Sequence, residues 1–381
     1  VGKAKLLYVS PERLMTENMI DNLKLLDIGL FVIDEVHCVS KWGQSFRPDY
    51  EELSKLKYFF PTSNIVGFTA TADKTTRLDI INKIFDNEVD IYIKGFDRPN
   101  LSLSIIQKTN WKLQVIEFLN IRKHQSGIIY CISRKKTEEV AHFLTEKGFK
   151  ASAYHAGLEG TIRKKIQNIF MTENAHIVVA TIAFGMGIDK PDIRFVINLG
   201  LPDSMEAYYQ QIGRAGRDNK PSDTLMIYGL DDLVIRRRMI EQSDTDKEFK
   251  FRENKRLDYL LSYCETPECR RKVLLAYFDD TSDNCNNCDN CINPPKLIDG
   301  TVLAQKLLST IYKTGQNFGQ AHVINVIRGS EDKKIFDKGH HNLSVYGIGK
   351  NKSKEFWQSF LRQLLAYGHL KINFQKYGAV Q

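Results

Sequence analysis

The stretch Leu30-Phe31-Val32-Ile33-Asp34-Glu35-Val36-His37 decides the fold class of this chain. Its apolar first half predicts a short buried strand, and the two acids that follow mark the carboxyl end of that strand. Parallel α/β sheets bind their ligands at this edge. There, one carboxylate can hold Mg²⁺ through water, while the other orients or deprotonates the water that attacks a γ-phosphate. A solvated strand end is the alternative, but the preceding strand and the nearby His37 favour a catalytic pair, Asp34 and Glu35.

Outside this stretch, short apolar runs alternate with amphipathic stretches over residues 1–236. The runs are apolar throughout rather than alternating with polar residues, which is typical of parallel strands covered on both faces. Between them, Lys135–Lys147 has the apolar spacing of a helix that buries one face. This alternation predicts α/β architecture. The expected strands are Lys5–Val9, Leu30–Ile33, Ile65–Phe68, Gly127–Cys131, His176–Ala180 and Arg194–Asn198.

Breaks in the pattern predict the domain boundaries. The punctuation at Pro99-Asn100 divides the strands into two sets, so we expect two α/β lobes at 1–96 and 97–236, the first of them incomplete. Residues 237–295 are expected to be helical and to end in a cysteine cluster, after which Pro294-Pro295 marks a linker.

The last segment, 296–381, carries all of the excess positive charge. Of the 54 basic and 46 acidic residues, 13 and 5 lie here, so the rest of the chain is balanced. A local basic excess suits a polyanion such as nucleic acid, although a well-solvated surface is an equal alternative. The segment resembles a winged helix, with helices expected near 301–313, 319–328 and 353–367, a strand at Leu370–Phe374 and a turn at Lys376-Tyr377-Gly378.

Small hydroxyl residues end another expected strand, in Phe68-Thr69-Ala70-Thr71-Ala72-Asp73. These side chains are suited to bond to the acidic segment Asp34–His37 and to relay its state. Thr71 or Asp73 is equally suited to cap the helix that follows, and the two roles are compatible.

The segment Gln210–Asp218 has the most distinctive basic pattern in the chain. Arg214 and Arg217 are three residues apart and would share one helix face. The glycines between and beside them allow close backbone approach to a partner. An arginine that reaches a γ-phosphate across a cleft accelerates phosphoryl transfer by about 10³–10⁵. An exposed salt-bridging pair is the alternative, and we interpret the segment as catalytic.

Four segments resemble the conserved motifs of superfamily 2 helicases. Asp34–His37 resembles motif II and Phe68–Asp73 motif III, while Ala180–Pro191 resembles motif V and Gly213–Asp218 motif VI. Their particular residues are similar to those of the RecQ family, and the resemblance covers nearly the whole chain. It implies an ATP-dependent 3′→5′ DNA helicase that unwinds duplex DNA in replication, recombination or repair. The implied fold has two RecA-like lobes, the first incomplete, followed by a helical zinc-binding domain and a winged-helix domain.

The resemblance also assigns roles around the nucleotide. By motif position, Asp34 would hold Mg²⁺ and Glu35 the attacking water, with His37 completing the catalytic segment. Arg217 would be the arginine finger, with Arg214 beside it. The residues expected to face bound ATP are Gly187, Asp189 and Gln211.

The family's phosphate-binding loop, which ends in Gly-Lys-Ser or Gly-Lys-Thr, has no counterpart in this sequence. The family places that loop before the segment resembling Leu6–Leu14, so we interpret the chain as a fragment. Because nothing in the fragment would cradle the β- and γ-phosphates, we expect it to hydrolyse ATP poorly on its own.

The segment Val36–Tyr50 mixes aromatic side chains, which stack on bases, with cations that meet phosphates. In the RecQ family the matching loop senses single-stranded DNA and couples it to ATP hydrolysis. The resemblance assigns this role to Trp42, Phe46 and Arg47. At Gln44-Ser45 the sequence departs from the family, which commonly has histidine and an acid there. Ordinary packing of the two aromatic residues is the alternative.

The family resemblance implies further contacts to DNA in the second lobe and the winged helix. Contacts of this kind hold the sugar-phosphate backbone without reading sequence. For His155, a structural hydrogen bond is nearly as well supported, and a basic winged helix can also bind protein. The wing is expected at the turn Lys376-Tyr377-Gly378. The other expected DNA-binding residues are Ser133, Arg134, His155, Thr181, Lys350, Lys352, Lys354 and Arg362.

Five of the seven cysteines lie between 264 and 291. The spacing Cys285-x₂-Cys288-x₂-Cys291, with Cys269 sixteen residues earlier, offers four thiolates for a closed tetrahedral Zn²⁺ site. The same residues match the family's zinc ligands. Disulfides and an iron–sulfur cluster are the alternatives. Cys264 is a spare that could compete with Cys269, but we expect it not to be a ligand. Cys38 and Cys131 are expected to be small buried side chains.

Two other functions remain open: a non-catalytic DNA-binding protein and an RNA helicase of the same superfamily. The cysteine cluster followed by a winged helix argues against the RNA helicase. No apolar run approaches the roughly 18 residues that span a bilayer, so no membrane association is expected. We expect a cytosolic protein with reduced thiols, partnered by single-stranded and duplex DNA at a fork.

Overall fold

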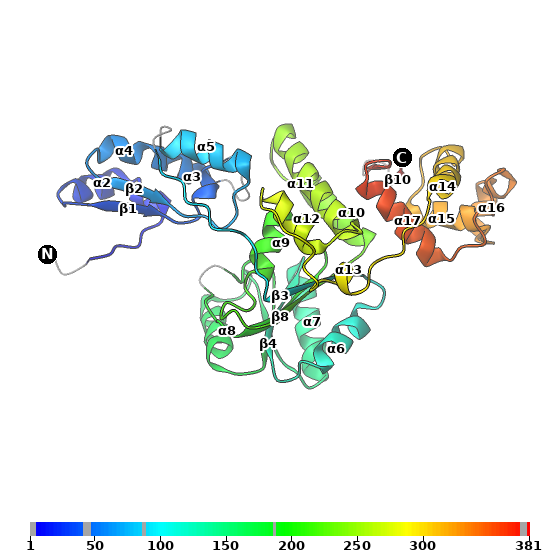
Figure 1. The fold of residues 1–381 in the computed structure, drawn as a ribbon, viewed down its shortest axis with the longest axis horizontal. Coiled ribbons are helices and arrows are strands. Elements are labelled where there is room, and N and C mark those ends of the chain that lie inside the picture. Colours follow the sequence, from blue (N-terminus) through cyan, green and yellow to red (C-terminus); the bar gives the residue numbers. More distant parts are fainter. Residues whose placement is uncertain (1–4, 41–46, 86–88, 186–187, 374–378) are drawn as a thin grey trace. The chain divides into compact units, whose positions relative to one another are not determined.

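The computed structural model describes residues 5–40, 47–85, 89–185, 188–373 and 379–381 (Figure 1). The chain divides into two compact units. The first unit contains Val1–Asp97 and Leu274–Asp283, and the second contains Arg98–Val273 and Asn284–Gln381.

The first unit has a small parallel sheet backed by short helices. β1 (Leu30–Ile33) pairs in parallel with β2 (Asn64–Gly67), which confirms two predicted strands to within one residue. Helices and sheet share a core in which Val39 and Leu56 are fully buried. The other elements are α1 (Pro11–Leu14), α2 (Glu17–Lys24), η1 (Val36–Val39), α3 (Pro48–Glu51), η2 (Glu52–Lys55), α4 (Leu56–Phe59) and α5 (Lys74–Ile84).

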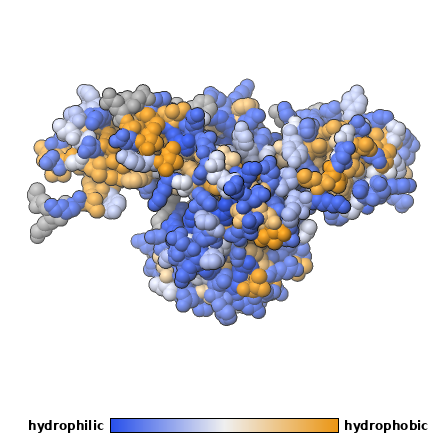
Figure 2. All heavy atoms as spheres, in the orientation of Figure 1, coloured by the Kyte–Doolittle hydropathy of each residue, from blue (hydrophilic) through white to orange (hydrophobic). Residues whose placement is uncertain are grey.

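The other face of this small sheet is open in the structure. Leu30, Val32 and Val66 are 51%, 56% and 36% exposed, so the expected coverage of both faces is wrong here. Figure 2 shows apolar side chains gathered on the surface of this unit. The predicted strand Lys5–Val9 is also wrong. No strand among the described residues pairs with it, and an isolated strand leaves its backbone groups without partners.

The second unit is built on a six-stranded parallel sheet in the order β3-β8-β7-β4-β6-β5. Two of its interior strands, β4 (Ser126–Cys131) and β6 (His176–Ala180), are buried along their whole length because helices pack against the sheet. These strands and β7 (Ile193–Leu199) confirm three predictions, and α7 (Arg134–Glu146) confirms the predicted helix to within one residue. The other elements are β3 (Leu101–Gln107), α6 (Trp111–Asn120), β5 (Lys150–Tyr154), α8 (Gly160–Thr172), α9 (Met205–Ile212) and β8 (Ser222–Tyr228).

The direction of the chain reverses between two neighbouring strands of this sheet. After β4 the chain crosses toward β5, whereas after the adjacent β7 it turns toward β8. Open α/β sheets bind ligands in the crevice outside the carboxyl ends of strands at such a reversal. This edge is therefore where the second lobe should present functional side chains.

A helical segment follows the sheet. It contains α10 (Leu230–Gln242), α11 (Lys247–Glu265), α12 (Arg270–Tyr277) and α13 (Asp289–Ile292). The boundary expected after residue 236 falls inside α10, which runs on from β8 after a single residue.

The C-terminal segment has the predicted helices α14 (Thr301–Lys313), α15 (Gln320–Arg328) and α17 (Lys354–Ala366). Trp357 of α17 is fully buried and donates its indole N–H to Gly349 O at 3.0 Å, which anchors the helix. The remaining elements are α16 (Lys333–Asp337), η3 (His340–Asn342) and the antiparallel strands β9 (Ile372–Asn373) and β10 (Ala379–Val380).

Across the described ranges, no helix is both long and apolar enough to cross a membrane.

Candidate nucleotide, DNA and metal sites

The acidic pair lies at the carboxyl end of β1, as expected. Glu35 has φ of 49°, in the left-handed region, so the chain turns sharply directly after the strand. His37 is buried, and its Nδ1 lies 2.9 Å from Thr69 Oγ1 and 3.3 Å from Glu35 Oε2. The hydroxyl segment, Phe68–Asp73, and the acidic segment, Asp34–His37, are thus joined through the imidazole ring of His37, which is the contact the sequence suggested.

The same hydroxyl segment also begins a helix. Asp73 accepts a hydrogen bond from Thr76 N at 2.7 Å, which confirms it as the N-cap of α5. Arg77, one turn later, donates to Ala72 O at 2.9 Å and to Asp279 Oδ2 at 3.0 Å. Sequence reasoning did not single out Arg77, because its partner lies 202 residues away.

The arginine segment follows α9 in the second unit. A Cβ atom at Gly185 would lie 3.1 Å from Arg214 Nη2, so glycine leaves the space in which this guanidinium sits. Arg217 forms an ion pair with Asp189, with Nη1 and Oδ1 2.7 Å apart. Gln211 is buried and accepts a hydrogen bond from Asn198, so its side-chain oxygen is directed to a neighbouring strand.

Arg98 and Asn100, which flank Pro99 at the expected boundary between the lobes, hold this segment in place. Arg98 donates to Ala215 O and Gly216 O, both at 2.9 Å. Asn100 donates to Gly216 O at 2.8 Å. Arginine and asparagine directly around Pro99 were the available signal, since both side chains can donate to several carbonyls at once.

The second-lobe residues expected to meet DNA lie at the carboxyl ends of their strands. Ser133 caps α7 by accepting from Lys136 N at 3.2 Å, and Thr181 follows β6. His155 is buried with Nε2 3.0 Å from Glu138 Oε1, so the structural hydrogen bond foreseen as its alternative is present. Arg134 is exposed, and a Cβ atom at the nearby Gly157 would lie 3.1 Å from its Nη1.

A pocket of about 520 Å³ opens beside Ser133, at the reversal between β4 and β7. Leu199 and Trp111 contribute its apolar wall. Lys136 lies on its rim, with Nζ 3.8 Å from the centre of the Trp111 ring. The crevice expected from the strand order therefore exists and has aromatic and basic walls.

In the winged helix, Lys350 and Lys354 are exposed, and Lys352 is half-buried with Nζ 4.9 Å from the Phe356 ring centre. Arg362 differs from its expected role. It is only 5% exposed and is ion-paired with Glu265, so its guanidinium is enclosed in the protein.

Four of the residues or segments predicted to be functional lie outside the described residues: Trp42, Phe46, Gly187 and the turn Lys376-Tyr377-Gly378. Arg47, which follows the first two, is exposed and donates its backbone N–H to Cys38 O at 3.0 Å.

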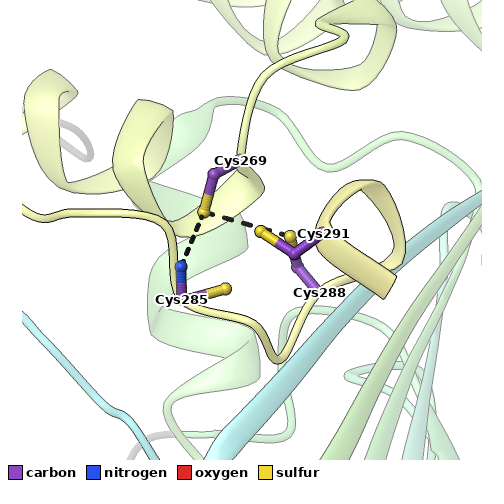
Figure 3. Close-up of side chains that lie close together, drawn as sticks. All are labelled: Cys269, Cys285, Cys288 and Cys291. Carbon is purple, nitrogen blue, oxygen red and sulfur yellow. Dashed lines mark hydrogen bonds between the residues drawn. The ribbon is translucent and has the colours of Figure 1, made fainter. Parts of the chain in front are cut away.

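The four predicted metal ligands converge (Figure 3). The Sγ atoms of Cys269, Cys285, Cys288 and Cys291 all lie within 4.8 Å of one another, and those of Cys269 and Cys288 are 4.0 Å apart. Tetrahedral Zn–S bonds of about 2.3 Å would separate sulfurs by roughly 3.8 Å. The cysteines therefore fit one Zn²⁺ in a closed site that leaves no position for a substrate.

The backbone favours the ionised thiols that a metal needs. Cys285 N donates to Cys269 Sγ at 3.3 Å, and Arg270 N donates to Cys288 Sγ at 3.4 Å. Burial opposes ionisation of Cys269, but backbone donors from Lys272 and Cys285 outweigh it and lower the pKa of this thiol to about 7.

The remaining cysteines are separate from this cluster. Cys264 is buried, with Sγ 3.5 Å from Met226 Sδ, so it does not compete with Cys269 as a ligand. Cys38 and Cys131 are buried, as predicted. All seven cysteines are free in the structure.

Comparison with known families matches consecutive parts of the chain to four domains. These are a DEAD/DEAH box helicase domain at residues 1–79, a helicase conserved C-terminal domain at 108–219, a RecQ zinc-binding domain at 230–292 and an RQC domain at 294–381.

Comparison with individual proteins points to the same family. The chain is 45% identical to the ATP-dependent DNA helicase RecQ of Haemophilus influenzae over 372 residues, which are 97% of this chain and 60% of that protein. It is 34% identical to the ATP-dependent DNA helicase RecQ of Bacillus subtilis, over 98% of this chain and 63% of that protein. The RecQ-like DNA helicase blm-1 of Caenorhabditis elegans is 37% identical over 96% of this chain and 40% of that protein. The chain thus spans less than two thirds of the length of each of these three relatives.

This chain belongs to the RecQ family of helicases. The predicted fold class is confirmed: RecA-like α/β lobes with parallel sheets are followed by a helical zinc-binding domain and a winged helix.

Proposed function

We propose that this chain is the unwinding core of an ATP-dependent 3′→5′ DNA helicase that acts on duplex DNA in replication, recombination or repair. One observation carries the proposal: both helicase domains, a zinc-binding domain and an RQC domain match in that order along one chain. The last two favour DNA over RNA, because a cysteine cluster followed by a basic winged helix suits a grip on duplex DNA.

In this proposal, Asp34 holds Mg²⁺ and Glu35 orients the water that attacks the γ-phosphate. The bound nucleotide supplies the reactive phosphate, and Mg²⁺ neutralises its charge. The His37 contacts support the assignment, since Nδ1 lies close to both Glu35 Oε2 and Thr69 Oγ1. A shift of the hydroxyl segment would then move the ring that faces the acidic pair.

Arg217 would stabilise the charge that develops on the transferred phosphoryl group, with Arg214 beside it. Arg98 and Asn100 would act as positioning residues, because they hold the carbonyls of the loop between the two arginines. Gly187, Asp189 and Gln211 complete the proposed nucleotide-facing set.

The translocated strand would run along the carboxyl edge of the second-lobe sheet, where Ser133, Arg134 and Thr181 lie at strand ends. Trp42, Phe46 and Arg47 would sense that strand in the first lobe. The exposed Lys350 and Lys354 and the neighbouring Lys352 would hold duplex DNA in the winged helix. The zinc site would keep the segment between these parts folded.

The isolated chain should bind DNA but hydrolyse ATP slowly, because its 381 residues contain no Gly-Lys-Ser or Gly-Lys-Thr loop. Fluorescence anisotropy with a DNA fork, an RNA fork and single-stranded DNA tests the first part. We expect the DNA fork to bind tightest, with an affinity that falls steeply with salt. Tighter binding of the RNA fork would favour an RNA helicase instead.

A longer polypeptide that supplies a phosphate-binding loop upstream tests the catalytic part. In it, Glu35→Gln should lower DNA-stimulated ATP hydrolysis at least about hundredfold and leave DNA binding intact. Glu17→Gln removes the charge of an exposed carboxylate in α2 of the same unit. It is the matched control and should change neither ATP hydrolysis nor DNA binding. Full ATPase activity in the Glu35 variant would contradict the proposed role of this residue.

A further inference from the structure

Arg362 of α17 is enclosed by partners from outside the winged helix. Its Nε donates to Glu265 Oε1 at 2.7 Å, and its Nη2 donates to Gln107 Oε1 at 3.2 Å. The side chains of Arg362 and Glu265 are only 6% and 8% exposed. A guanidinium held in this way cannot meet a DNA phosphate without giving up both partners.

These partners connect the winged helix to the zinc-binding domain and to the second lobe. Glu265 is the last residue of α11. Gln107 ends β3 and is the register partner of Tyr228, which ends the neighbouring β8. Arg362 therefore reaches the carboxyl edge of the second-lobe sheet.

Tyr228 completes the cluster. Its hydroxyl donates to Glu265 Oε1, the same atom that accepts from Arg362. Burial, and then the neighbouring Glu265 carboxylate, raise the pKa of Tyr228 well above its ordinary value, so the hydroxyl stays protonated and keeps donating. One carboxylate oxygen thus joins side chains from the sheet and from the winged helix.

A second hydrogen bond ties the same two helices, because Ser262 Oγ of α11 donates to Ala366 O at the end of α17 at 2.8 Å. By contrast, the linker between α13 and α14 has no helix or strand, and its Leu297 and Ile298 are 74% and 53% exposed. The exposed linker offers little packing to hold the winged helix on the lobe, whereas α17 contacts α11 directly.

A buried ion pair fixes the orientation of one domain on another better than an apolar contact surface does. Apolar surfaces can slide past one another, whereas a buried charge that loses its partner is left desolvated and uncompensated. The pair therefore penalises every orientation of the winged helix except the one in which Arg362 meets Glu265.

We propose that Glu265, Arg362 and Tyr228 form an interdomain clamp that fixes the winged helix in one orientation on the second lobe. Arg362 is then a positioning residue rather than a DNA contact. One consequence rests on the proposed function: duplex DNA gripped by the winged helix would move together with the second lobe during each ATP cycle. The clamp itself does not depend on helicase activity.

Hydrogen–deuterium exchange in the full 381-residue chain tests the clamp without DNA or ATP. The variants are Glu265→Gln, Arg362→Met and the double substitution. We expect each single change to speed exchange of the α17 amides at least about tenfold, because it leaves one buried partner uncompensated. The double variant should exchange no faster than the faster single variant. Lys354→Met, which removes an exposed cation from the same helix, is the matched control and should leave exchange unchanged.

Unchanged α17 exchange in both single variants would overturn the clamp, as would strictly multiplicative effects in the double variant. Binding to a DNA fork separates the clamp from the DNA-contact alternative. If Arg362→Met lowers the salt dependence of binding while Glu265→Gln has no effect on α17, Arg362 contacts DNA and the clamp is wrong. If Arg362→Met fails to fold, Glu265→Gln and Ser262→Ala decide by the same exchange measurement. If the unmodified chain did not bind DNA, that result would count against the proposed helicase function and would leave the clamp untouched.

Discussion

Arg217 is paired with Asp189 rather than directed freely into solvent, and the two groups lie 2.7 Å apart. The carboxylate is 84% exposed and the guanidinium 34% exposed, so water screens their attraction. Exposed ion pairs of this kind contribute only about 0–1 kcal/mol to stability. A phosphate with more negative charge can therefore take the arginine from the aspartate at little cost.

Substitution of Arg217 should consequently affect catalysis far more than folding. In a polypeptide that carries a phosphate-binding loop, Arg217→Ala should lower ATP hydrolysis by about 10³-fold or more. Asp189→Asn should change the free energy of unfolding by less than about 0.5 kcal/mol. Steady-state ATPase assays and urea denaturation measure the two effects. A large stability loss in the Arg217 variant would show that the pair is structural.

The loop between the two arginines should depend on Gly216. This residue has φ of +56°, and a Cβ atom there would lie 2.4 Å from Asn100 Nδ2 and 2.9 Å from Lys220 O. Gly216→Ala should therefore cost about 2–3 kcal/mol, from backbone strain together with the displaced asparagine. Urea denaturation provides the measurement.

Gly148→Ala is the matched control for this change. Gly148 has φ of +83°, but nothing lies within 4 Å of an added Cβ atom. It should cost only the strain of the left-handed conformation, about 1 kcal/mol. Equal losses at the two glycines would contradict the claim that Gly216 is needed for the contact with Asn100.

The strands that could be predicted from sequence are continuous apolar runs, whether both faces are covered, as in β4, or one face is open, as in β1. β4 and β6 are continuous apolar runs because helices cover them. β3 was missed because it is an edge strand in which polar residues alternate with apolar ones. Ser102 of β3 donates to Asp223 of β8 at 2.6 Å, a lateral contact that no local pattern reveals.

The same distinction holds for the site residues. The four zinc ligands could be predicted because three of them are close in sequence, and their spacing is itself a geometric constraint. Arg362 could not, since its partner Glu265 lies 97 residues away and a basic residue on a helix has the same local pattern whether it is exposed or buried. Arg98 was missed for the same reason, with its partners more than 110 residues distant.

Removal of one zinc ligand should remove the metal. Cys288→Ser should lower bound zinc from about one per chain to near zero and unfold the segment around α13, because a structural zinc site contributes folding energy directly. Cys264→Ser, at a buried cysteine outside the cluster, should retain the metal. Elemental analysis after gel filtration measures the ratio. Zinc loss in the Cys264 variant would overturn the ligand assignment.

Zinc affinity should also rise with pH. Burial opposes ionisation of Cys269, but backbone hydrogen bonds outweigh it and lower the pKa of this thiol to about 7, whereas burial raises the pKa values of the other three thiols above the ordinary range. Near neutral pH the metal must displace protons from those three, so each rise in pH lowers the competition. Chelator competition at several pH values between 6.5 and 8.5 should show the trend. An affinity that does not depend on pH would exclude ligation by thiolates.

The winged helix should lose stability in mild acid because of His322. This residue is 8% exposed, its Nε2 lies 2.8 Å from His340 Nδ1, and Phe318 stacks on its ring. Burial, and then the charge of His340, lower the pKa of His322 to about 4. The folded state therefore favours neutral His322, and the unfolded state binds the proton first as pH falls below the ordinary value of about 6.5.

The loss should begin below about pH 6.5 and reach roughly 2 kcal/mol at pH 5, continuing toward pH 4, where the folded state also takes up the proton. Urea denaturation of the chain at pH 7.5 and at pH 5, followed by exchange of the α15 amides, measures it. His322→Phe keeps an aromatic ring against Phe318 but cannot be protonated, so its stability should vary less between the two pH values. If this variant lost as much stability at pH 5 as the unmodified chain, His322 would not be the group responsible.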